Sequence, residues 1–234
     1  MLARPVADSL PAVSTLTHLQ SHHMATARAA RHAAFVREAA LDSSTVTRTL
    51  LVAFPTTLRY ARRLPCDNTL KEAFWRLAIN AVPGSTIRPW LCPCASTPFP
   101  SPRIHAFWEC PVAVQVRAQL ASSIGFAPSR PSVWLLSCPP PRVPPPLWRL
   151  VCVASVYAMD VGRRRLWALF NAPSQPGIAD RIAAASNVAT LHFWTTLRDV
   201  ARDQSAIVSD WLLSHDSPFM AVRDGRVVVN MPIS

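Results

Sequence analysis

Proline is the residue that most restricts how this 234-residue chain can fold, because its 23 prolines are unevenly spread. A proline inside a helix removes a backbone hydrogen bond and clashes with the preceding turn, so long helices need stretches that are free of it. The prolines gather at 89–102 and 128–146, with a further one at Pro111. We therefore expect irregular segments within these clusters and helices on either side of them.

The stretches outside the proline clusters have the apolar spacing of helices. One helix is expected to begin at Asp67-Asn68-Thr69, with Glu72 in capping-box spacing from Thr69, and to end at Pro83-Gly84. Two short apolar runs around Asp224-Gly225 predict a hairpin within Met220–Met231. The fold class is thus mainly α with a short C-terminal β-hairpin. Further helices are predicted at 12–41, 44–63, 111–123, 147–170, 178–204 and 205–214.

The same pattern divides the chain into four segments. These are an N-terminal helical region at 1–66, partly disordered, a domain at 67–123, a Pro-rich connector at 124–146, and a C-terminal helical region at 147–234 that carries the hairpin. The connector is expected to be partly polyproline II, because Pro139-Pro140-Pro141 and Pro144-Pro145-Pro146 fall within it.

Glycine and acidic residues exclude several classes of enzyme. The five glycines are isolated, so the glycine-rich patterns of dinucleotide folds, P-loops and nucleophile-elbow hydrolases cannot occur. A polymerase or nuclease that uses two metal ions needs paired carboxylates, but Glu109 is the only acidic residue between 73 and 159. We therefore expect a protein that is not an enzyme and has no small-molecule substrate.

The chain is strongly basic, with 24 basic against 13 acidic residues and a formal net charge of +11. All basic residues except Lys71 are arginine. Two interpretations stay open: compositional drift from a GC-rich coding sequence, or a surface that binds a polyanion.

No apolar run reaches the roughly 18 residues of a membrane span, and the longest, 150–159, ends at Asp160. Six cysteines are too few for a disulfide scaffold, which favours an intracellular location, nuclear or cytoplasmic. Residues 1–63 hold eight arginines and three acidic residues, a composition that also fits an organelle transit peptide. Removal of about the first 60 residues is therefore left open.

Four residues with metal-ligand chemistry lie close together in the sequence: Cys92, Cys94, His105 and Cys110. Three thiolates and an imidazole form a tetrahedral structural zinc site, and a segment so rich in proline would need such a metal to fold. Cys92 and Cys94 have one residue between them, where two to four are usual. The alternative is three buried free thiols and a core histidine. If zinc binds without one of the four, Cys66 is the reserve fourth ligand.

The segment around these residues resembles the zinc-binding domain of reverse transcriptases, which follows the polymerase in retrotransposons without long terminal repeats. The similarity covers about 68–123. Phe74 and Trp75 match its first helix, and His105, Phe107, Trp108, Cys110 and Pro111 match its end. The resemblance implies a zinc-knuckle-like nodule and a function in binding RNA or DNA.

Arginines near the nodule are candidates for contact with a nucleic acid. Arg88, Arg103 and Arg117 would contact phosphates, and Trp108 would stack on a base. In the alternative, Trp108 packs beneath the metal loop and the arginines are solvated. A rival function is a metal-free, vestigial fragment whose helices at 147–214 bind another protein.

Overall fold

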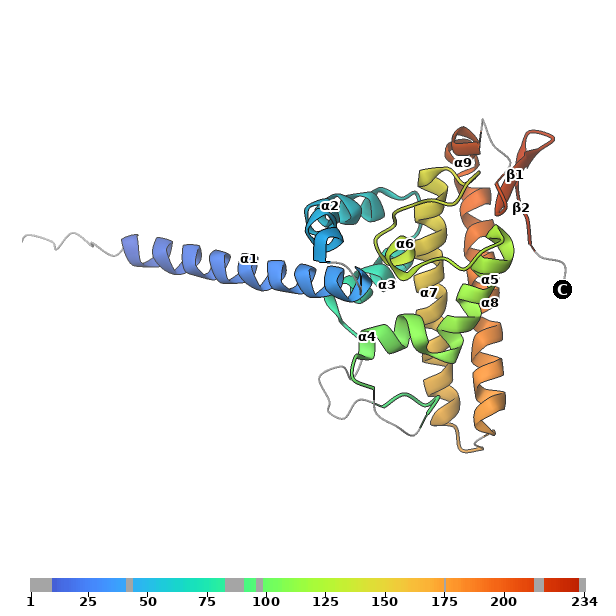
Figure 1. Cartoon of the computed structure of the whole chain (residues 1–234), viewed down its shortest axis with the longest axis horizontal. Coiled ribbons are helices and arrows are strands. Elements are labelled where there is room, and N and C mark those ends of the chain that lie inside the picture. Colours follow the sequence, from blue (N-terminus) through green and yellow to red (C-terminus); the bar gives the residue numbers. More distant parts are fainter. Residues whose placement is uncertain are drawn as a thin grey trace, which may run out of the picture.

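The computed structural model describes residues 10–40, 44–82, 91–95, 99–174, 176–212 and 217–231, and it is mainly helical with one small antiparallel hairpin (Figure 1). The predicted fold class is confirmed. Its elements are α1 Leu10–Ala40, α2 Ser44–Arg63, α3 Asn68–Ile79, α4 Pro102–Ile104, the π-helix η1 His105–Glu109, α5 Pro111–Ile124, α6 Arg130–Trp134, α7 Pro145–Phe170, α8 Ile178–Asp203, α9 Ser205–Leu212, β1 Met220–Arg223 and β2 Arg226–Val229.

Helix α7 is the central element of the fold. It packs most extensively against α8, and α3, α5, α2 and η1 cover its other sides. A side chain at Gly162 would place its Cβ 2.5 Å from Cγ1 of Val112 and 2.8 Å from Cβ of Ala189. Helices α5, α7 and α8 can therefore approach this closely only because position 162 carries no side chain.

Helix α3 begins where the sequence predicts, but its capping box and its C-terminal end differ from the prediction. Asp67 caps the helix, because its carboxylate accepts hydrogen bonds of 2.7 Å from the backbone N–H and the hydroxyl of Thr69. Glu72 pairs with Arg76 instead of completing a capping box. The helix ends at Asn80, whose φ of 59° is left-handed, and not at Pro83-Gly84.

The Pro-rich stretch at 124–146 was predicted to be a connector, but it forms part of the core. It contains α6, whose Trp134 is fully buried and stacks on Phe35 of α1 at a centroid distance of 5.7 Å. The indole N–H of Trp148 donates to the carbonyl oxygen of Ser137 at 2.9 Å. Buried residues from all four predicted segments belong to one cluster, so these segments do not have separate cores.

The two ends of the described chain are built differently. Helix α1 projects from the body in Figure 1; residues 24–31 are exposed, whereas Phe35, Val36 and Ala39 are buried. The hairpin turns at Asp224 and Gly225, both with positive φ, as a two-residue hairpin turn requires.

Within the part of the chain that the structure describes, no helix has the length and apolar character to cross a membrane.

Candidate metal centre

The first pair of candidate ligands lies on a tight turn. The backbone N–H of Ala95 donates to the carbonyl oxygen of Cys92 at 3.1 Å, which closes a four-residue turn. Pro93 is its second residue, where the fixed φ of proline suits a turn. Cys92 and Cys94 are the first and third residues, so the turn explains how one intervening residue can bring both thiols to one site.

The second pair is brought together by the π-helix. The backbone N–H of Cys110 donates to the carbonyl oxygen of His105 at 2.7 Å, five residues back in the chain. In an α-helix, side chains three or four residues apart share a face, so residues five apart diverge. The wider turn of η1 accommodates the extra residue and places His105 and Cys110 on the same side.

The four side chains converge on one small space. Their candidate ligand atoms all lie within 4.8 Å of one another, and Cys92, His105 and Cys110 are buried. Tetrahedral zinc with Zn–S bonds of about 2.3 Å holds two sulfurs roughly 3.8 Å apart, which this group can adopt with small adjustments. The Cys94 sulfur is 3.2 Å from Nε2 of His105, and the ring of Phe99 stacks on the imidazole.

The pKa values of the three thiols shift in different directions. Hydrogen bonds from the Cys92 and Cys94 thiols lower the pKa of Cys110, and its place at the N-terminus of α5 favours the same thiolate. The hydrogen bond to Cys110 in turn raises the pKa of Cys94 to about 12 and also raises that of Cys92. Without a metal, ionisation of one thiol opposes ionisation of the others. The positive charge of a bound zinc ion would favour the thiolate form of all three cysteines.

The structure does not support the predicted phosphate contact at Arg103. Its side chain is 2% exposed, and Nε donates to a carboxylate oxygen of Glu38 at 2.7 Å. Its guanidinium also donates to the carbonyl oxygens of Leu77 and Ala78 at 3.3 Å. Arg103 therefore joins α1 and α3 to the metal centre instead of facing solvent.

Arg117 and Trp108 are also engaged within the protein. The guanidinium carbon of Arg117 lies 4.2 Å from the centroid of the Trp108 ring, and the guanidinium donates to the Trp108 carbonyl oxygen at 3.0 Å. Trp108 also meets Trp134 edge to face, as expected if it packs beneath the metal loop. Burial lowers the pKa of Arg117. The fourth predicted residue, Arg88, lies outside the described residues.

Sequence reasoning missed a buried ionic cluster where α3 meets α7. The carboxylate of Asp160 is 2% exposed and lies 2.8 Å from the guanidinium of Arg163, which is 3% exposed. Arg164 and Arg76 approach the same carboxylate at 3.2 and 3.5 Å. The signal in the sequence was the spacing within α7, where Arg163 and Arg164 follow Asp160 at i+3 and i+4.

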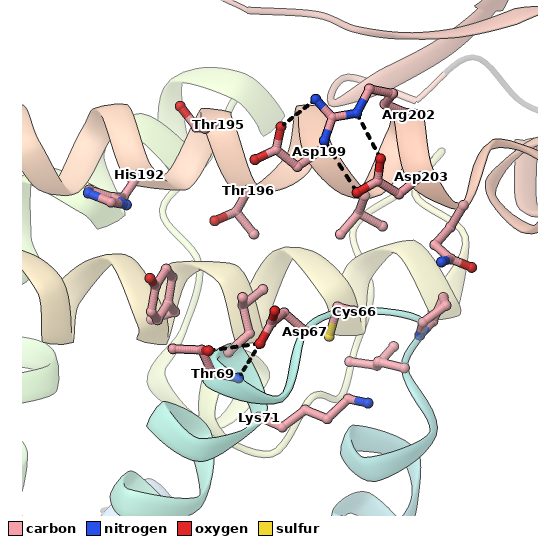
Figure 2. Close-up of a pocket in the computed structure, with 16 residues that line it drawn as sticks. Cys66, Asp67, Thr69, Lys71, His192, Thr195, Thr196, Asp199, Arg202 and Asp203 are labelled. Carbon is pink, nitrogen blue, oxygen red and sulfur yellow. Dashed lines mark hydrogen bonds and ion pairs between the residues drawn. The ribbon is translucent and has the colours of Figure 1, made fainter.

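A groove of about 670 Å³ is lined by residues within 64–71, by Tyr157 of α7 and by residues of α8 (Figure 2). The carboxylates of Asp199 and Asp203 both pair with Arg202, and Asp67 caps α3, so each of these three groups is already engaged. Cys66, the reserve ligand, lines this groove and not the metal centre. Burial raises the pKa of its thiol to about 11.

The other cysteines are separate from the four-residue group. Cys152 is fully buried in the core, whereas Cys138 is exposed. Comparisons of the chain with protein-family models, curated proteins and solved structures found no match. The chemistry of the metal centre therefore has to be argued from its donor atoms and their geometry.

Proposed function

We propose that this protein is a non-catalytic zinc-binding module in which Cys92, Cys94, His105 and Cys110 hold one zinc ion. The observation that carries the proposal is the convergence of these four donors within 4.8 Å, three of them from buried residues. Thiolates and imidazole favour zinc over magnesium or calcium, which prefer oxygen ligands. Four protein ligands leave no open position for substrate, which supports a structural role.

The zinc ion would stabilise the fold by linking two local structures. It would join the turn at 92–95 to η1, and through Cys110 to the start of α5. Neither short segment has a core of its own, so metal binding would contribute directly to the free energy of folding.

We further propose that the module engages nucleic acid and derives from the tail of a retrotransposon polyprotein. Two observations support this: the resemblance of residues 68–123 to the zinc-binding domain of reverse transcriptases, and the net charge of +11. A polyanion would release counterions on binding such a chain, so binding should weaken steeply with added salt.

The metal content of the full-length chain tests the zinc site. We expect about one zinc per chain by native mass spectrometry after purification without a metal-binding tag, and its loss in Cys94→Ser. Cys94 is half-buried, which makes this substitution milder than one at a buried ligand. Cys138→Ser is the matched control, because Cys138 is exposed and outside the centre.

Two results would contradict the zinc proposal: no metal in the wild-type protein after refolding with excess zinc, or equal metal in Cys94→Ser and Cys138→Ser. The first result would favour the metal-free interaction domain, and the second would show that Cys94 is not a ligand. A protein partner of such a domain could contact exposed apolar side chains of α8 and α9, since Leu191 is 61% and Ile207 is 41% exposed.

A further inference from the structure

Helix α2 presents a basic face that the sequence analysis did not single out. Thr56, Arg59, Tyr60 and Arg63 follow the i, i+3, i+4, i+7 spacing that places side chains on one side of a helix. Arg59, Arg63 and the neighbouring Arg62 are exposed, and the Tyr60 side chain is 42% exposed. An exposed aromatic ring thus shares one side of the helix with two exposed guanidinium groups, those of Arg59 and Arg63, and Arg62 adds a positive charge farther around the helix.

A third arginine joins this face from another element. The guanidinium carbon of Arg149, on α7, lies 3.8 Å from the centroid of the Tyr60 ring. Stacking at this distance fixes the position of both planar groups, because an arginine is attracted to the face of an aromatic ring. The face is therefore held in place by tertiary packing between α2 and α7.

The charges of this face are available, unlike those near the metal centre. Among the described residues, none of Arg59, Arg62, Arg63 and Arg149 forms an ion pair with an acidic side chain, and Arg59 donates only to the Thr56 hydroxyl at 3.0 Å. By contrast, Glu38 engages Arg103, and Asp160 engages Arg163 and Arg164.

We propose that this Arg–Tyr face, formed by Arg59, Tyr60, Arg63 and Arg149, binds single-stranded nucleic acid. Its guanidinium groups contact successive phosphates, and a base stacks on the Tyr60–Arg149 pair. Single strands fit better than duplexes, because only an unstacked base exposes its face to a planar side chain. The inference rests on the nucleic-acid part of the proposed function and moves the interface from the metal nodule to α2.

The location on α2 makes the two sites separable by experiment. Helix α2 packs mainly on α1, α3 and α7, whereas η1 packs mainly on α4, α5 and α7. Substitutions on the exposed side of α2 should therefore leave the zinc content unchanged, which native mass spectrometry on each variant verifies.

The first test measures binding of a fluorescein-labelled oligouridylate to the full chain by fluorescence anisotropy over a range of salt concentrations. We expect Arg59→Gln/Arg63→Gln to weaken binding at least tenfold and to reduce the slope of log K against log salt by about 1.4, since each lost phosphate contact removes about 0.7 for a single strand. Arg165→Gln/Arg226→Gln is the matched control, because it removes the same charge from two other exposed sites. It should retain most of the affinity.

The second test examines stacking. Tyr60→Ala should lower the affinity about tenfold, the usual scale for loss of one base–aromatic contact, whereas Tyr60→Phe keeps the ring and should bind like the wild type. Circular dichroism of each variant verifies that helix content is preserved. A matched DNA duplex should bind less tightly than the single strand.

The outcomes distinguish the two proposals. If the wild-type protein binds no oligonucleotide, the nucleic-acid part of the proposed function fails. If it binds but Arg59→Gln/Arg63→Gln behaves like Arg165→Gln/Arg226→Gln, the interface is elsewhere and only the present inference is overturned. Equal binding of polyglutamate, with no effect of Tyr60→Ala, would indicate an acidic protein partner and would also overturn it.

Discussion

Asp160 is the residue on which the buried charges of α7 converge. Its carboxylate and the guanidinium of Arg163 are both almost completely removed from water, and Arg164 and Arg76 add to the same group. Such an arrangement contributes little net stability over an apolar pair, because desolvation offsets the attraction between the charges. Removing one partner is different, since it leaves an uncompensated charge in the core.

We expect Asp160→Asn to lower the free energy of unfolding by about 3–5 kcal/mol, because Arg163 would stay buried without its carboxylate. Urea denaturation followed by circular dichroism measures the change. Asp203→Asn is the control, since its pair with Arg202 is exposed and screened by solvent. Equal shifts in the two variants would show that Asp160 does not neutralise a buried charge.

The run Arg163-Arg164-Arg165 shows how far residue-level prediction reaches. Three consecutive arginines in a helix are typical either of a solvated helix face or of an anion-binding site. In the structure, Arg163 is buried, while Arg164 and Arg165 are exposed. The sequence cannot make this distinction, because α7 is apolar on nearly every side and its pattern does not reveal which side meets α3.

At the level of elements, local chemistry predicts helices well and special turns poorly. The predicted ranges for α5, α7, α8 and the hairpin agree with the structure to within about two residues, because prolines, glycines and caps lie next to the ends they define. The turn at Cys92–Ala95 and the π-helix η1 had no such signal. The turn was visible only as the unusual spacing of Cys92-x-Cys94, and the spacing of His105 from Cys110 gave no indication of a π-helix.

The crossing of three helices at Gly162 gives a prediction at this scale. Gly162→Ala should destabilise the protein by about 1–3 kcal/mol through overpacking, although alanine is the better helix former by about 1 kcal/mol. The added Cβ would lie 2.5 Å from Val112 and 3.0 Å from the Ala185 carbonyl oxygen, which belongs to the backbone and cannot move aside easily.

Thermal unfolding of Gly162→Ala, Val112→Ala and the double variant measures this effect. Val112→Ala removes the closest atom, so the double variant should be more stable than the sum of the two single changes indicates. Strict additivity would mean that α5 and α7 do not contact each other at this point.

At the scale of the whole molecule, one core draws on segments far apart in the sequence. Phe35 of α1 stacks on Trp134 of α6, and Glu38 pairs with Arg103 beside the metal centre. Composition and helical periodicity predicted the fold class, but they carry no information on which helices pair. This is why the stretch at 124–146, judged from its prolines, was expected to be a connector.

Because the candidate ligands belong to this shared core, metal binding should stabilise the entire protein. We expect the thermal midpoint to rise with the concentration of free zinc. The free energy of unfolding should increase by about 2.7 kcal/mol when that concentration is 100 times the dissociation constant. Differential scanning calorimetry of chelator-treated and zinc-loaded protein measures this shift. Cys94→Ser should show no dependence on zinc, and a zinc-dependent midpoint in that variant would contradict the assigned ligand set.

The division of α1 into an exposed part and a docked part limits how far the chain can be shortened from its N-terminus. Residues 24–31 are exposed, so their removal takes no side chain from the described core. A truncation that removes about 60 residues takes away Phe35 and Phe54 and leaves Arg103 without Glu38. The boundary at which truncated chains cease to fold therefore falls inside α1, between its last exposed turn and Phe35.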